Sequence, residues 1–244
     1  MRVGIIGAGN MGSAFARRLA AAGHDVVIAS RDIEDAKEVA ASVGANVRDV
    51  PQQQLADRAD LVIAATPYQE QANALRASGR FEGKTVVEIS NPVKPDMSGL
   101  IVGHTTSAAE EVAKAVPGAR VVKAFNTVFA QVLADRALSA PTAAVQVFYA
   151  GDDAEAKNAV RSLIESIGLE PLDAGPLSNA RYLEPLGMLN IYLGYVAKMG
   201  TDIALAVRKA SRQGAEARAD QVARQAAPSR SATGRDQESR PSPG

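Results

Sequence analysis

The chain has 244 residues, no cysteine and no tryptophan, and its 27 Lys and Arg residues balance 27 Asp and Glu residues at a formal net charge of zero. This length suits one large domain or two modest ones with a buried core, whereas the lack of cysteine excludes disulfide scaffolds, thiolate metal sites and cysteine nucleophiles. With only two histidines, no apolar run of about 18 residues and no signal-peptide pattern, we expect no metal site and a cytoplasmic protein that does not span a membrane.

The chain then alternates between strand and helix patterns. RVGIIGAG at the start is a β-branched run that ends in glycines, which is typical of a buried parallel strand. Five further strands are expected at 25–30, 61–66, 85–90, 120–125 and 145–150, and helices at 13–22, 33–43, 69–78, 107–116 and 154–167. Such alternation implies right-handed crossovers and a doubly wound, mainly parallel α/β sheet.

The pattern changes after Gly168. One short strand is expected within LEPLDAG (169–175), and residues 180–209 have a helical pattern that three glycines interrupt. From Arg208 onward the chain has eight basic and four acidic residues and almost no large apolar ones. We therefore predict a main domain over 1–170, a small helical region over 171–210 and a disordered tail over 211–244. The 23 acidic and 19 basic residues of 1–207 argue against nucleic-acid binding.

A glycine motif directly follows the first strand and opens the first helix. It reads Gly7-Ala8-Gly9-Asn10-Met11-Gly12. In this context Gly7 permits a tight turn, Gly9 lets the backbone approach a pyrophosphate, and Gly12 lets the helix pack on the strand. The N–H groups of the first helical turn would then bind phosphate. The motif predicts a Rossmann-type dinucleotide site.

The end of the second strand indicates which dinucleotide binds. An NAD site has an acidic residue there for the ribose hydroxyls, but this chain has Ser30-Arg31. A hydroxyl followed by a guanidinium can bind a 2′-phosphate, and Asp32 is expected to cap the next helix instead. We therefore predict NADP(H).

Two more strand ends should border the nicotinamide. Thr66 and Pro67 follow one strand and Asn91 follows the next. Ligands of open α/β sheets bind at the carboxyl ends of strands, so we expect these three residues beside the cofactor.

At this point the sequence resembles a known family. The glycine motif, Ser30-Arg31, SAAEEVAKAVPGARVVKAFNT (107–127) and the run from AGDD to LDAGPLSNARYLEPL (150–186) are similar to NADP reductases dependent on coenzyme F420, an 8-hydroxy-5-deazaflavin. The resemblance covers residues 1–205. It implies a Rossmann domain with a small C-terminal helical part, bound NADP(H), a homodimer, and reversible hydride transfer between NADP(H) and the deazaflavin. KAFNT also resembles the cytosolic domain of the six-transmembrane epithelial antigen of the prostate metalloreductases, in which NADPH reduces a flavin.

The candidate catalytic residues lie at the end of the strand 120–125. Asn126 stands where archaeal members of the family have a histidine near the deazaflavin, and it is expected to donate a hydrogen bond to the second ring. Lys123 is a polar residue in a buried strand and is expected to face the substrate. Ring-to-ring hydride transfer needs close stacking and no general acid, which suits a chain with few candidate acids.

Two other functions stay open from the sequence. One is an NADPH-dependent reductase of another acceptor, such as a flavin, a quinone or an imine, and the other is a non-catalytic NADPH sensor. The C-terminal segment 188–207 is more apolar than a solvent-exposed helix should be. We predict that it forms a homodimer contact, and that the other partners are small-molecule hydride donors or acceptors.

Overall fold

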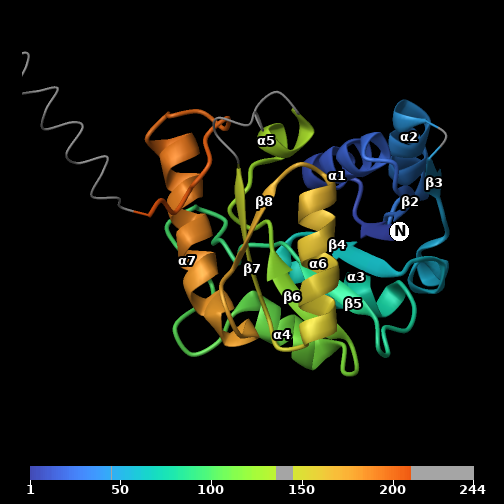
Figure 1. Ribbon diagram of the computed structural model, residues 1–244. Helices are drawn as coiled ribbons and strands as arrows, with labels where there is room; N and C mark the ends of the chain where they lie inside the picture. The colour runs from blue at the N-terminus through green and yellow to red at the C-terminus, as the bar shows by residue number, and fades with distance from the viewer. Residues whose placement is uncertain (45, 136–144, 210–244) are drawn as a thin grey trace, which may run out of the picture. The chain divides into compact units, whose positions relative to one another are not determined.

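Eight strands form a single sheet in the order β3-β2-β1-β4-β5-β6-β7-β8 (Figure 1). The computed structural model of the chain describes residues 1–44, 46–135 and 145–209. Strands β1 to β6 are parallel, β7 is antiparallel to β6, and β8 is parallel to β7. Their bounds are β1 Arg2–Ile6, β2 Asp25–Ala29, β3 Val47–Asp49, β4 Leu61–Ala64, β5 Thr85–Glu88, β6 Arg120–Ala124, β7 Gln146–Gly151 and β8 Glu170–Asp173.

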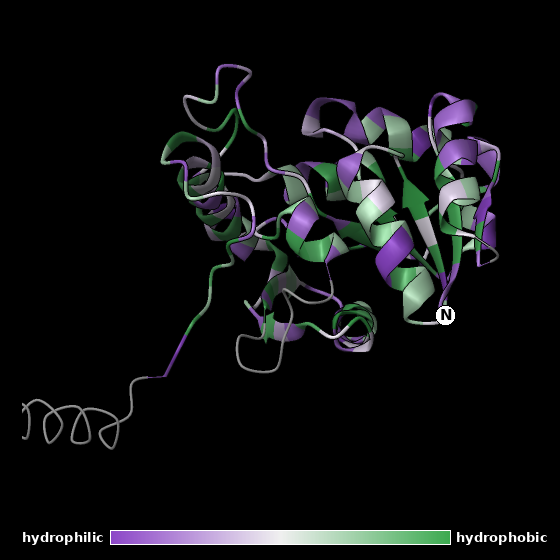
Figure 2. Ribbon diagram, turned by 90° about the horizontal axis from the view of Figure 1, so that it is seen from above, coloured by the Kyte–Doolittle hydropathy of each residue, from purple (hydrophilic) through white to green (hydrophobic). Residues whose placement is uncertain are grey.

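Helices cover both faces of this sheet. Apolar side chains of α1, α2, α5 and α6 pack on one face, and those of α3, α4 and α7 pack on the other. Figure 2 shows the green, apolar strands between helices that carry purple, polar stretches. The bounds are α1 Asn10–Ala21, α2 Ile33–Val43, α3 Tyr68–Ala77, α4 Ala108–Ala115, α5 Ala130–Ala134, α6 Ala154–Ser166 and α7 Ala180–Ile191, with short turns η1 Gln52–Gln54, η2 Ala56–Arg58 and η5 Leu177–Asn179, and a π-helical turn η6 Tyr192–Val196.

Local sequence explains where several helices begin. Asp32, Ser107 and Asp153 each cap a helix N-terminus by accepting a backbone N–H bond, at 3.0, 3.2 and 2.8 Å. Caps of this kind satisfy N–H groups that have no partner within the helix. The expected cap at Asp32 is confirmed, so its carboxylate is committed to the backbone of α2.

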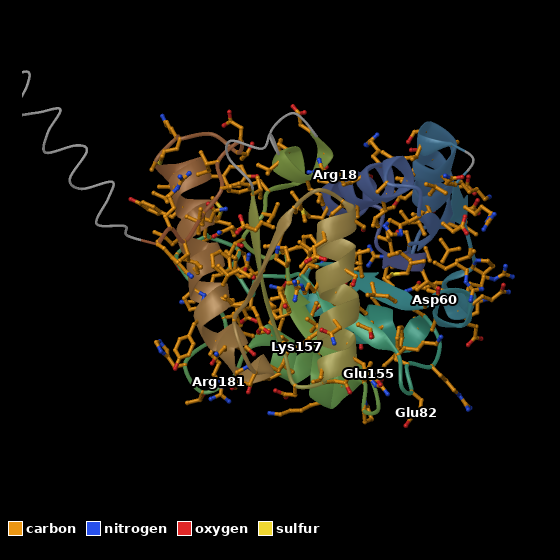
Figure 3. The ribbon with its side chains drawn as sticks, in the orientation of Figure 1. Arg18, Asp60, Glu82, Glu155, Lys157 and Arg181 are labelled. Atoms are coloured by element: carbon orange, nitrogen blue, oxygen red, sulfur yellow. The ribbon has the colours of Figure 1, made fainter. Side chains whose placement is uncertain are left out.

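A buried arginine connects α1 to the end of α6, two helices that pack on the same face of the sheet. Arg18 of α1 is 4% exposed, and its Nε donates a hydrogen bond of 2.8 Å to the carbonyl oxygen of Ile167, which follows α6. Figure 3 shows Arg18 where α1 meets the end of α6.

The doubly wound α/β fold is confirmed, although several elements, α5 among them, differ from the predicted ones. Strand β3 has only three residues, too few for a recognisable alternation, and was not predicted. The last helix was expected to extend to residue 209 but ends with η6, because Lys198 (φ 58°) and Gly200 (φ 89°) have left-handed backbone.

The expected division at residue 170 stays a prediction. Residues Met1–Ala206 form one compact unit, and residues 207–209 belong to a second. The tail predicted over 211–244 lies outside the described residues. None of the helices in the described part of the chain is long and apolar enough to cross a membrane.

Candidate functional site

The glycine loop between β1 and α1 has the backbone that its sequence requires. Gly7 has φ 106°, and a Cβ at this position would lie 2.6 Å from the carbonyl oxygen of Ala65. A Cβ at Gly12 would overlap the carbonyl oxygen of Gly7, so α1 packs against the loop only because residue 12 is glycine.

Gly9 is the exposed position of this loop. No described atom lies within 4 Å of the place where its Cβ would be, and no described side chain caps α1, whose N-cap is Gly9. The N–H groups of the first turn therefore face open space at the positive end of a helix, an arrangement that binds phosphate.

A cavity of about 460 Å³ lies beside this loop and is called the glycine-loop cavity here. Seven predicted site residues line it: Gly7, Ala8, Gly9, Ser30, Arg31, Thr66 and Pro67. The Arg31 side chain is 86% exposed, and its guanidinium lies 3.4 Å from Glu70 Oε2 on α3. Such an exposed ion pair is weak, so the guanidinium can turn to a phosphate group.

A second cavity, of about 550 Å³, is called the strand-end cavity because residues following β4, β5 and β6 line it. The two cavities adjoin, since both include Gly9, Ala65, Thr66, Pro67 and Gln69. Seven predicted site residues line the second cavity: Gly9, Asn10, Met11, Thr66, Pro67, Asn91 and Asn126. Gly12 and Lys123 line neither.

Asn91 and Asn126 form one wall of the strand-end cavity through reciprocal hydrogen bonds. Asn91 Nδ2 donates to the Asn126 carbonyl oxygen at 2.7 Å, and Asn126 Nδ2 donates to Asn91 Oδ1 at 2.9 Å and to the Leu183 carbonyl oxygen at 2.7 Å. Both amide N–H groups of Asn126 are thus used within the protein. The expected donation to a substrate ring is not available, and Asn126 offers its Oδ1 as an acceptor instead.

The packing of Phe125 and the absence of a side chain at Gly187 hold this wall in place. Phe125 has φ 61°, which is unusual for a bulky residue, and its ring packs edge-to-face on Phe15 with centroids 5.0 Å apart. A Cβ on Gly187 of α7 would lie 2.7 Å from Asn126 Nδ2 and would also clash with the Asn91 amide. Helix α7 therefore reaches the wall only because residue 187 lacks a side chain.

Lys123 lies behind this wall in a buried charge cluster. Its Nζ donates to Glu88 Oε2 at 2.6 Å, to Glu184 Oε1 at 3.0 Å and to the Ser90 carbonyl oxygen at 2.5 Å. All three N–H bonds of the ammonium group are used, and the side chain is fully buried. The geometry places the ammonium away from both cavities and against the backbone of Ser90, which does line the strand-end cavity.

Glu184 joins this cluster to α4. It accepts backbone N–H bonds from Ala108 at 3.0 Å and Ala109 at 3.3 Å, at the N-terminus of that helix. Burial raises the pKa of Glu184, and the neighbouring Glu88 acts in the same direction, whereas Lys123 and the Ala108 N–H lower it. A bidentate ion pair at 2.6 and 2.8 Å between Arg181 and Glu110 fixes the same helix pair at the surface; Figure 3 shows Arg181 at the lower end of α7.

Several buried polar atoms beside the strand-end cavity have no hydrogen-bond partner among the described residues. They are Thr66 Oγ1, Ser90 Oγ, Asn126 Oδ1 and Asn190 Oδ1. Buried polar atoms are nearly always paired in folded proteins, so these four indicate a polar ligand.

Aromatic residues that the sequence did not single out complete this cavity. Phe129 and Tyr195 are packed edge-to-face with ring centroids 5.7 Å apart. Tyr68 donates its hydroxyl to Glu111 Oε2 at 2.5 Å, and burial, followed by the Glu111 carboxylate, raises its pKa to about 12. The fold brings these aromatic residues together, and no local sequence signal indicates it. For the buried cluster, by contrast, a charged residue within each of two apolar strands, Glu88 and Lys123, was a signal that could have predicted an ion pair.

Several known proteins are similar to this chain. Residues 2–92 match the family model described as "NADP oxidoreductase coenzyme F420-dependent". The F420-dependent NADP reductase of Methanothermobacter marburgensis is 31% identical over 209 residues, which cover 79% of this chain and 92% of that protein. Metalloreductase STEAP3 of Rattus norvegicus is 30% identical over 190 residues, and the chain spans only 37% of its length.

A solved structure extends the likeness to the fold. The crystal structure of a putative F420-dependent NADP reductase from Arthrobacter sp. FB24 has a TM-score of 0.77 and 29% identity, and the match covers 86% of this chain and all of that one. Given these matches and the nearly full coverage of the Methanothermobacter enzyme, the chain belongs to the family of coenzyme F420-dependent NADP oxidoreductases.

Proposed function

We propose that this protein transfers hydride between NADP(H) and a deazaflavin ring, coenzyme F420 or a close relative. The observation that carries the proposal is the pair of adjoining cavities that meet at Gly9, Thr66 and Pro67. A dinucleotide is long enough to occupy the first cavity with its phosphates and to extend its nicotinamide into the second. When bound, NADPH supplies the hydride.

The residues of the glycine-loop cavity suit NADP(H) better than NAD(H). Ser30 and Arg31 border this cavity, and the carboxylate of Asp32 is occupied as a helix cap. Asp32, Asp35 and Glu70 all line it, and their charges oppose a 2′-phosphate, so Arg31 must outweigh them. A bidentate guanidinium contact with phosphate is strong enough to do so.

The strand-end cavity suits the two reacting rings. Thr66, Pro67 and Asn91 border the place for the nicotinamide, and Asn126 Oδ1 can accept a hydrogen bond from its carboxamide N–H. The buried Lys123 cluster acts as a positioning device that fixes the Ser90 backbone. Precise placement is what hydride transfer between stacked rings requires.

One observation favours a second candidate function, the reduction of an imine or a carbonyl compound. Such a reaction needs a proton donor, and Tyr68, which lines the cavity, could supply one if its hydroxyl turned from the Glu111 carboxylate, to which it donates in this structure. The two candidates differ in their dependence on this hydroxyl. A Tyr68→Phe variant retains ring-to-ring transfer and loses imine or carbonyl reduction.

The exposed side of α7 and η6 supports the predicted homodimer. Tyr182, Leu189 and Met199 are between 50% and 74% exposed, and a second copy of the chain would cover them. Light scattering should give twice the chain's mass, and a monomeric mass at micromolar concentration would refute the dimer.

The test of the proposed function is steady-state NADPH oxidation by the full chain with deazaflavin, FMN, menadione, a cyclic imine or no acceptor. Saturable turnover with the deazaflavin, and much slower turnover with the others, is expected. Turnover only with FMN or menadione would assign another acceptor. Tight NADPH binding without any turnover would favour the sensor.

A further inference from the structure

The end of α7 departs from regular helix where it reaches the strand-end cavity. Over Tyr192–Val196 the chain forms a π-helical turn, closed by the Ala197 N–H bond to the Tyr192 carbonyl oxygen at 2.9 Å. Turns of this kind are rare, and those that occur are often found at functional sites. A Cβ on Gly194 would lie 2.7 Å from the Phe129 ring, so the turn can approach α5 this closely only with glycine.

The wide turn places Tyr195 at the cavity. Its ring meets Phe129 edge-to-face, with an interplanar angle of 89°. Phe129 is 8% exposed and Tyr195 is 54% exposed, and both line the cavity. Phe129 thus supports the tyrosine ring, and much of Tyr195 stays open to a ligand.

Asn190 lies less than two turns earlier and also lines the cavity. It is 2% exposed, its Nδ2 donates to the Thr127 carbonyl oxygen at 3.1 Å, and its Oδ1 has no partner among the described residues. The Thr127 bond fixes which way the amide points. Asn190 therefore offers a buried hydrogen-bond acceptor to a ligand that carries a donor group.

We propose that Tyr195 is the stacking residue for the acceptor ring and that Asn190 accepts a hydrogen bond from a ring N–H. The ligand class is a planar fused heterocycle with an imide-like N–H edge, which flavins and deazaflavins have and quinones and simple imines lack. This inference rests on the proposed function, and it makes α7 and η6 the specificity element.

The variants Tyr195→Leu, Tyr195→Phe and Asn190→Leu test the proposal in the full chain. Tyr192→Leu is the matched control, because Tyr192 is in the same turn and is 49% exposed, but does not line the cavity. Tyr195→Leu should raise the KM for deazaflavin about 3- to 10-fold, and Tyr195→Phe should restore it. The NADPH Kd from calorimetry should stay within about twofold in every variant, as expected for residues that contact only the second ring.

A test of the Asn190 role needs two ligands that differ only in the ring N–H group. Calorimetric titration of NADP⁺-loaded protein with deazaflavin and with its N3-methyl analogue provides it. The native protein should prefer the N–H ring about 3- to 10-fold, and Asn190→Leu should remove that preference.

Failure of this inference can be told from failure of the proposed function. If the native protein reduces deazaflavin and Tyr195→Leu has the same KM as Tyr192→Leu, the stacking role is wrong and the proposed function stands. If the native protein reduces no ring, the proposed function is wrong and the titration decides: binding that Tyr195→Leu weakens supports the inference, and equal or absent binding overturns it.

Discussion

Replacing Lys123 by methionine tests how the charge cluster behind the site works. Lys123 Nζ pairs with Glu88 at 2.6 Å and with Glu184 at 3.0 Å, and the three side chains are at most 1% exposed. Methionine has a similar length and no charge. The variant therefore leaves two carboxylates facing the same buried space without a counter-ion.

The expected loss is large for one side chain. Removing one partner of a buried ion pair costs about 3–5 kcal/mol, against a total stability of about 5–15 kcal/mol for a typical domain. One carboxylate can escape part of this cost by taking up a proton. Burial already raises the pKa of Glu184 above its ordinary value of 4.5, and the loss of Lys123 raises that pKa further. A raised acid pKa stabilises the fold below 4.5 and loses that contribution as pH rises through the folded-state pKa, so the variant should be weakest at neutral and higher pH.

Urea unfolding, followed by circular dichroism, measures this loss. The double variant Lys123→Met/Glu184→Gln removes one of the two carboxylates and should be more stable than Lys123→Met alone at neutral pH. A loss below about 1 kcal/mol in Lys123→Met, or a double variant that is no more stable than the single one, would refute the argument.

Three further predictions concern the surrounding residues. Arg31→Ala should weaken NADPH binding about 10- to 100-fold and leave NADH binding unchanged; an equal loss for both in calorimetry would contradict the 2′-phosphate role. Gly187→Ala should lower the free energy of unfolding in urea by about 1–3 kcal/mol. Gly103→Ala is the control and should be neutral, because a Cβ there meets no described atom within 4 Å. Equal effects of the two substitutions would contradict the close approach of α7 at Gly187. Hydrogen bonds from Arg181 and then Ser107 hold the pKa of Glu110 below its ordinary value of 4.5, so native stability should lose this contribution as pH falls below about 4.5, and Glu110→Gln should lack that step. If the free energies of unfolding of the native protein and of Glu110→Gln change equally with pH across this range, Glu110 makes no pH-dependent contribution there.

The sequence predicted the sheet because buried parallel strands and capped helices have strong local signals. Asp32 shows this best, since its place after β2 and before an apolar helix predicted the observed cap. The glycine motif is also a local signal, and Gly7 and Gly12 have the close backbone contacts that their positions in the motif imply.

The chemistry of the strand ends depends on long-range contacts and was harder to predict. Asn91 and Leu183, which lie 35 and 57 residues away, take up the Asn126 N–H groups and so leave only its Oδ1 for a ligand. Lys123 was expected at the substrate, but Glu184, 61 residues later, draws its ammonium into the interior. Tyr195 reaches the cavity only through a π-helical turn, and no periodicity in the sequence indicates one.

Isotope transfer tests the central claim most directly. NADPH carrying deuterium at nicotinamide C4, on each face in turn, would be mixed with the full chain and deazaflavin, and the reduced ring analysed by mass spectrometry. Direct transfer between stacked rings places the deuterium of one labelled face on C5 of the deazaflavin, where a carbon–deuterium bond does not exchange with water. A reduced ring without deuterium from either face, or no reduced ring, would contradict the account.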